Sequence, residues 1–286
     1  MRRFIFALVL PVIVLVGCRS TVELKPDATT FSVNPMFGSN MVLQREMMVP
    51  VWGRGLPGEV IGLEINRKKY AVKVNRKGRW ILRLQPIPVG GPYTMKITGK
   101  VNTITFTNVM SGDVWICSGQ SNMQWPVSRA LNSDKEIDAA KYPNIRLFSV
   151  KRKVSPKLLD KLEGKWVECS PETVGSFSAV GYFFGRDLYK ALKNVPIGLI
   201  HSSWGGTPAE AWTRKNYLNA NPMFHAILQR HDEKIKAYPQ NLKIYKQALA
   251  EQKKSGKKYS PYHNDTGTRG LTGGWEDKDY CDRKWP

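Results

Sequence analysis

Cysteine is scarce in this sequence, with four residues in 286, and so small a number excludes a fold built on a disulfide framework. Acidic residues are also few, because 23 Asp and Glu stand against 44 Lys and Arg. The net charge of +21 favours an anionic partner, such as nucleic acid, a lipid surface or an acidic substrate. The sequence has no zinc-type cysteine spacing and no Walker motif, so we predict no metal and no cofactor.

The first 18 residues predict export. Two arginines follow Met1, and an apolar run from Phe4 to Val16 precedes Cys18. The run is shorter than the ~20 residues of a spanning helix, and the residues before Cys18 resemble a bacterial lipobox. With Arg19 after the cysteine, this resemblance implies a lipid anchor in the outer membrane of a Gram-negative bacterium. An ordinary cleaved signal peptide or a short anchor is the alternative, and in each case nucleic acid is excluded as the partner.

The rest of the chain shows two kinds of pattern. Residues 19–33 are polar and predict a tether. Residues 34–110 contain short alternating segments such as Val60–Ile65 and Arg79–Leu84, with Gly78 available for a turn, and predict a small β-sandwich. From residue 111 strands and helices alternate, which predicts an α/β domain with a parallel sheet covered by helices on both faces.

Three finer expectations concern this second part. The apolar run Val114–Cys117 predicts a strand buried on both faces. Helical spacing over Phe177–Leu192 predicts an amphipathic helix, whose apolar side chains are Val180, Phe184, Leu188 and Leu192. Beyond Tyr217, helical stretches are expected to be interrupted at Pro222 and Pro239.

The strongest local signal for chemistry is the run Ser-Gly-Gln-Ser-Asn-Met over residues 118–123, directly after the apolar strand. Ligands bind outside the carboxyl ends of the strands in open α/β sheets, so Ser121 would stand above the sheet at a ligand site. Backbone N–H groups of a following helix would be suited to hold an oxyanion there. Taken as a bare tetrapeptide, the same serine is better interpreted as a helix N-cap, and only the surrounding residues favour the site.

The surrounding residues resemble a known family. Residues 112–123 resemble block I of the sialate O-acetylesterases, which are SGNH-type carbohydrate esterases, and residues 196–212 resemble the glycine block of that family. Segments 41–45, 50–53, 169–173 and 177–183 match it in the same order. The resemblance implies an SGNH-hydrolase-like (flavodoxin-like) three-layer α/β domain after the β-sandwich, and hydrolysis of acetyl esters on a sugar such as sialic acid.

The same resemblance assigns roles to residues. Ser121 would be the nucleophile, and the backbone N–H groups of Ser121 and of Gly205 or Gly206 would hold the oxyanion. The remaining substrate-site candidates are Gln120, Asn122, Glu210 and Trp212. For Trp212, packing in the core is an equal alternative.

Two later blocks of the family are missing: the Asn block and the Asp-x-x-His stretch that supplies the base. None of the four histidines, at positions 201, 225, 231 and 263, lies in such a context, and we expect a structural role for His201 and solvated positions for His225 and His231. Residues 275–286 resemble the start of a β-rich insertion within the esterase domain. We therefore interpret the chain as the N-terminal portion of a longer enzyme, with the first part of the esterase domain over 111–274 and a truncated insertion over 275–286. An acetyl-xylan-type esterase, and a non-catalytic glycan-binding lipoprotein or pseudoenzyme, are the alternatives.

Overall fold

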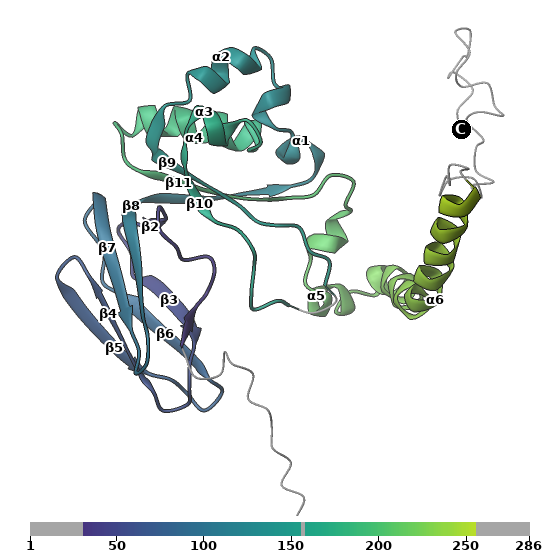
Figure 1. The fold of residues 1–286 in the computed structure, drawn as a ribbon, viewed down its shortest axis with the longest axis horizontal. Coiled ribbons are helices and arrows are strands. Elements are labelled where there is room, and N and C mark those ends of the chain that lie inside the picture. The colour runs from purple at the N-terminus through teal and green to yellow at the C-terminus, as the bar shows by residue number, and fades with distance from the viewer. Residues whose placement is uncertain (1–30, 156–157, 256–286) are drawn as a thin grey trace, which may run out of the picture. The chain divides into compact units, whose positions relative to one another are not determined.

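The computed structural model describes residues 31–155 and 158–255, drawn as a ribbon in Figure 1. The chain divides into two compact units, the first ending at Thr207 and the second beginning at Pro208. Cys18 with its predicted anchor, the predicted tether up to residue 30 and the predicted insertion at 275–286 lie outside the described residues. The end of the predicted tether, residues 31–33, is instead part of the folded unit, because Phe31 is buried in the core and Ser32–Val33 pair with a strand. Within the described ranges, no helix combines the length and the apolar character needed to cross a membrane.

The first unit holds eleven strands and four α-helices in its described part. The strands are β1 (Ser32–Val33), β2 (Val42–Gln44), β3 (Val49–Arg54), β4 (Val60–Ile65), β5 (Lys68–Lys73), β6 (Arg79–Leu84), β7 (Gly90–Thr98), β8 (Thr103–Gly119), β9 (Tyr142–Ser149), β10 (Trp166–Cys169) and β11 (Ile197–Ser203). The helices are α1 (Ser121–Gln124), α2 (Ser133–Asp138), α3 (Pro171–Val174) and α4 (Ala179–Ala191). Strands β4 and β6 have the bounds expected from their sequence pattern.

The strands of this unit form two sheets. One has the order β1-β3-β6, and the other has the order β10-β9-β11-β8-β7-β4-β5 with β2 paired to β8. Burial alternates along the strands: β6 buries Trp80, Leu82 and Leu84 and exposes the residues between them. Buried side chains of both sheets, including Val51 and Ile97, form one cluster. The sheets therefore share one hydrophobic core.

Strand β8 connects this core to the region of the predicted site. Its first part pairs antiparallel with β7, and residues 113–119 pair parallel with β11. The sheet continues through β9, parallel to β11, and β10, antiparallel to β9, so it is mixed. The expected division between residues 110 and 111 falls inside this one strand.

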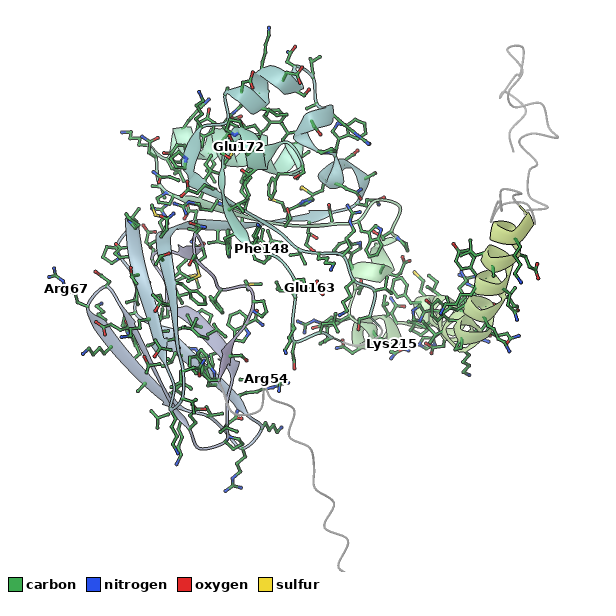
Figure 2. All side chains as sticks on the ribbon, viewed as in Figure 1. Arg54, Arg67, Phe148, Glu163, Glu172 and Lys215 are labelled. Carbon is green, nitrogen blue, oxygen red and sulfur yellow. The ribbon has the colours of Figure 1, made fainter. Side chains whose placement is uncertain are left out.

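Helices cover one face of the β9-β11-β8 part of the sheet (Figure 1), where Phe177 and Tyr182 pack on strand residues such as Leu199. The opposite face contributes Phe148, labelled in Figure 2, and Ile200 to the core shared by the two sheets. The expectation of helices on both faces is therefore not met among the residues described. Successive side chains of a strand point to opposite faces, so these strands pack into two different cores.

The expectation that Val114–Cys117 is buried on both faces is wrong. Trp115 is 44% exposed and Ile116 is 72% exposed. In the described part of the chain, β8 beyond residue 112 is paired with β11 on one side only. An unpaired strand edge leaves neighbouring side chains open to solvent.

Helix α4 exists as expected, and its expected apolar face is confirmed in part, because Leu188 and Leu192 pack against the core. Val180 and Phe184 are exposed, whereas Tyr182 and Gly185 are buried. A Cβ atom at Gly185 would lie 2.6 Å from Cδ1 of Leu199, so glycine allows the helix to approach the sheet closely. Apolar spacing alone could not indicate a contact made through small residues.

The second unit contains α5 (Lys215–Asn219) and α6 (His225–Ser255). A short 3₁₀ turn, Pro222–Phe224, separates them, which confirms the expected break at Pro222. The expected break at Pro239 is wrong, because α6 continues through it. Proline has no backbone N–H and therefore removes one helical hydrogen bond, and a long helix can accommodate this loss by bending. His225 and His231 are exposed, as expected.

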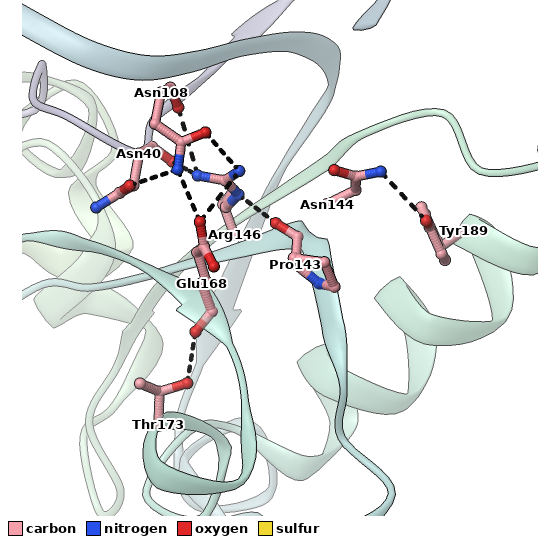
Figure 3. A network of polar contacts seen from close by, with 8 residues as sticks. All are labelled: Asn40, Asn108, Pro143, Asn144, Arg146, Glu168, Thr173 and Tyr189. Atoms are coloured by element: carbon pink, nitrogen blue, oxygen red, sulfur yellow. Dashed lines mark hydrogen bonds and ion pairs between the residues drawn. The ribbon is translucent and has the colours of Figure 1, made fainter. Parts of the chain in front are cut away.

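A buried arginine joins four segments of the first unit (Figure 3). Arg146 is 2% exposed, and its Nε donates to the carbonyl oxygen of Pro143 at 2.6 Å. Its Nη1 donates to the carbonyl oxygens of Asn40 and Asn108, at 3.3 and 3.4 Å, and Nη2 donates to Oδ1 of Asn108 at 3.1 Å. Glu168 lies 3.5 Å from Nη2. Burial lowers the pKa of Arg146, and the charge of Glu168 opposes this shift.

Replacing Arg146 with leucine is expected to lower the free energy of unfolding by about 2 kcal/mol, because buried carbonyl groups lose their donors. The expected loss of stability is no larger because the Glu168 carboxylate does not become a buried unpaired charge. Its side chain is 44% exposed, so water can solvate it once Arg146 is gone. Urea denaturation of the variant measures the change. Arg76→Leu, at an exposed turn position, is the control, and an equal effect of both variants would contradict the role given to the network.

Candidate active site

Ser121 is the first residue of α1, at the carboxyl end of β8. The turn depends on Gly119, whose φ of +146° favours glycine. Gln120 occupies the N-cap position, and the Ser121 side chain is exposed together with that of Asn122. Because Gln120 and not Ser121 is the N-cap residue, capping does not account for this serine.

The parallel pairing of β8 with β11 brings the two separated motifs together. Ser203 lies beside Gly119 in the register, and the N–H of Trp204 donates to the carbonyl oxygen of Gly119 at 3.0 Å. A Cβ atom at Gly205 would lie 3.3 Å from Cα of Ser121. The backbone of the glycine block therefore lies directly against the serine.

One of the expected oxyanion donors is already hydrogen-bonded. The N–H of Gly205 donates to Oε1 of Gln124 at 2.6 Å. Gly205 can therefore donate to an oxyanion only when the Gln124 side chain turns away. Gly206, with φ of +76°, is the neighbouring candidate. Sequence reasoning missed Gln124, although an amide three residues after Ser121 shares its helix face.

His201 connects β11 to the serine turn. Its Nε2 lies 2.5 Å from Oγ of Ser203, and the ring is hydrogen-bonded to the backbone of Met123. The ring also packs edge-on against Phe177, with 5.3 Å between centroids. Burial lowers the pKa of His201, the charge of Arg152 lowers it further, and the bond to Met123 opposes both. These contacts support the structural role expected for this histidine.

We expect His201 to make the stability of the protein depend on pH. Its pKa in the fold lies below the ordinary value of 6.5, so the unfolded chain binds more protons as the pH falls through about 6.5. The stabilising effect is therefore present above that pH and is lost below it. Thermal melts between pH 7.5 and 5.5 should show a smaller loss for His201→Gln than for the unaltered chain. An unchanged slope in the variant would contradict the assignment.

The other expected site residues are distributed over both units. Gln120 and Asn122 are exposed next to Ser121, whereas Glu210 and Trp212 belong to the second unit, in the 3₁₀ turn Ala209–Trp212. Trp212 is 44% exposed, which argues against packing in a core.

The described part of the first unit contains one histidine, His201, and its ring is already engaged. The two described cysteines, Cys117 and Cys169, are free and buried, and burial raises the pKa of their thiols to about 11 and about 12. These thiols are therefore protonated and poor nucleophiles. Ser118 and Ser121 are exposed serine hydroxyl groups at this edge of the sheet.

Comparison with solved structures defines the class. A carbohydrate acetylesterase from Xanthomonas citri superposes with a TM-score of 0.64 and 35% sequence identity, over 67% of this chain and 44% of that one. The fold is thus that of an α/β carbohydrate esterase. The family model for "Carbohydrate esterase, sialic acid-specific acetylesterase" matches residues 111–259. The chain belongs to this family of sialic acid-specific acetylesterases.

Two curated relatives agree with this assignment. Sialate O-acetylesterase of Mus musculus is 39% identical over 200 residues, and that of Homo sapiens is 37% identical over 202 residues. These alignments cover 63% and 64% of this chain. The chain spans 37% and 38% of the length of the two relatives.

Proposed function

We propose that this protein contributes Ser121 as the nucleophile of a carbohydrate O-acetylesterase. The observation that carries the proposal is the exposed Ser121 at the carboxyl end of β8, with the backbone of Gly205 against it. Oγ of Ser121 attacks the acetyl carbonyl carbon, and the N–H groups of Ser121 and of Gly206 or Gly205 hold the oxyanion. A base supplied from outside the described residues accepts the Oγ proton of Ser121 and gives it to the sugar oxygen, which leaves as a hydroxyl. Water, deprotonated by the same base, then attacks the acyl-enzyme, which releases acetate and restores the Ser121 hydroxyl.

The proposed substrate is an O-acetylated sialic acid, since the family and the named relatives act on this class. The test is acetate release from O-acetyl sialate and from acetylated xylan, with Ser121→Ala as the comparison. Faster release from xylan would favour an acetyl-xylan-type esterase. The engagement of His201 favours the non-catalytic glycan-binding alternative, for which neither substrate would release acetate above background.

We further propose that sequence beyond the described residues, in a longer form of the protein, completes the SGNH-like three-layer fold. The same sequence would supply the missing catalytic base. Ile116, 72% exposed beside the one-sided edge of β8, supports the completion of the fold, as does the greater length of the relatives. An apolar side chain on an open sheet face favours association.

Replacing Ile116 with serine is therefore expected to reduce self-association of this chain without loss of thermal stability. Sedimentation velocity over a range of protein concentrations measures it. Val101→Ser is the matched control, because Val101 is 65% exposed but lies in a turn. Equal behaviour of the two variants would speak against an exposed interface at β8.

The proposed location is the outer membrane, through a lipid on Cys18. Incorporation of labelled palmitate by the producing bacterium should occur in the unaltered protein and be lost in Cys18→Ala. Labelling that persists in the variant would contradict the anchor.

A further inference from the structure

A cavity of about 370 Å³ lies in the first unit, on elements other than those that carry Ser121. Its lining comes from β3 and β6, from residues 32–35, from Asn75 in the turn before β6 and from the segment at residues 160–161. Trp52 and Ile81, which are cross-strand neighbours, supply an apolar wall. Trp52 is held by an edge-to-face contact with Phe37, with 4.8 Å between ring centroids. The cavity therefore has a firm apolar side.

The other side of the cavity is charged, with three basic residues and one acidic residue. Arg54, labelled in Figure 2, and Arg79 both donate to the same oxygen, Oδ2 of Asp160, and the Arg79 distance is 3.2 Å. Lys161 adds a third positive side chain to the lining. Asp160 belongs to neither sheet, and its backbone oxygen accepts from Nδ2 of Asn34 at 2.9 Å. One carboxylate from a separate segment is thus shared by two guanidinium groups.

The Asp160 carboxylate is bound weakly enough for a ligand carboxylate to replace it. The side chains of Arg54, Arg79 and Asp160 are 45%, 58% and 54% exposed, and ion pairs at such exposure contribute little to stability. Guanidinium groups match the planar geometry of a carboxylate, and sites for small ligands combine apolar walls with a few placed polar groups. A sugar acid offers both features, a carboxylate and a ring with apolar faces.

We propose that this cavity binds an acidic sugar, with Arg54 and Arg79 taking the ligand carboxylate in place of Asp160. The choice of N-acetylneuraminate as the probe rests on the proposed function, but recognition of the carboxylate does not. Binding here requires no catalysis, so it is expected to persist in Ser121→Ala.

Isothermal titration of the full chain with N-acetylneuraminate, glucuronate, N-acetylmannosamine and acetate tests the proposal. The two sugar acids should bind, and the neutral sugar and acetate should bind much more weakly. Equal binding of acetate would reveal a plain anion site, and equal binding of the neutral sugar would remove the role of the carboxylate. Either result, or no binding at all, overturns the proposal and leaves the acetate-release assay of Ser121 unaffected.

Paired variants locate the site. Arg79→Gln should weaken binding of the sugar acids by about tenfold. Arg83→Gln, on the same strand and the same outward face but outside the lining, should leave it unchanged. Asp160→Asn should tighten binding, because it removes the competing charge, whereas a merely structural Asp160 would give weaker binding. Equal effects of Arg79→Gln and Arg83→Gln, or weaker binding in Asp160→Asn, would also overturn the proposal.

Discussion

Replacing Ser121 with alanine is expected to lower acetate release from an O-acetylated sugar by about 10³-fold. The variant lacks the Oγ atom that forms the acyl-enzyme in the proposed mechanism. Since the described first unit offers no unengaged imidazole, the rate is measured with imidazole added as a proton acceptor from solution. In the unaltered chain the rate should rise with the concentration of unprotonated imidazole. In the variant, acetate release should be no faster than in a solution that contains imidazole and substrate but no protein.

Ser118→Ala is the matched control for this experiment. Ser118 is exposed near the end of β8, three residues before Ser121, and has no part in the proposed chemistry. Its variant should retain the imidazole-dependent rate. If the unaltered chain and Ser121→Ala release acetate equally at every imidazole concentration, the nucleophile assignment is wrong and the glycan-binding alternative gains support.

Individual strands between residues 34 and 110 could be predicted from the sequence, because their signal is local. Alternation of apolar and polar residues has a period of two, and it gave the bounds of β4 and β6 correctly. The buried face of α4 could be predicted only in part, because Gly185 lies so close to the sheet that an added Cβ atom would be 2.6 Å from Leu199, and glycine carries no apolar signal. The exposure of Ile116 depends on which strands pair beside β8, and that is a property of the whole sheet.

The site shows the same division between local and distant information. Resemblance to ordered family blocks named Ser121 and Gly205, and the structure brings them together. The bond between Gln124 and Gly205 joins residues 81 positions apart, and the pair of His201 with Ser203 depends on both facing the same side of β11. The Gln124–Gly205 bond depends on the parallel register of β8 and β11, which no local pattern specifies, whereas the His201–Ser203 contact follows from side-chain alternation within β11.

Replacing Gly205 with alanine is expected to lower the imidazole-dependent rate by about 10²-fold, with little change in melting temperature. The new Cβ atom would lie 3.1 Å from Oε1 of Gln124 and 3.4 Å from Cβ of Ser121, so it displaces the serine or the N–H beside it. Gly206→Ala is the matched comparison: its φ of +76° makes it strained, by about 1 kcal/mol, but its Cβ atom meets no described atom within 4 Å. A larger rate loss in Gly206→Ala than in Gly205→Ala would assign the oxyanion N–H to Gly206. Gly205 would then have only its hydrogen bond to Gln124. The reason is that moving the N–H group that holds the oxyanion lowers the rate more than moving a neighbouring N–H group does.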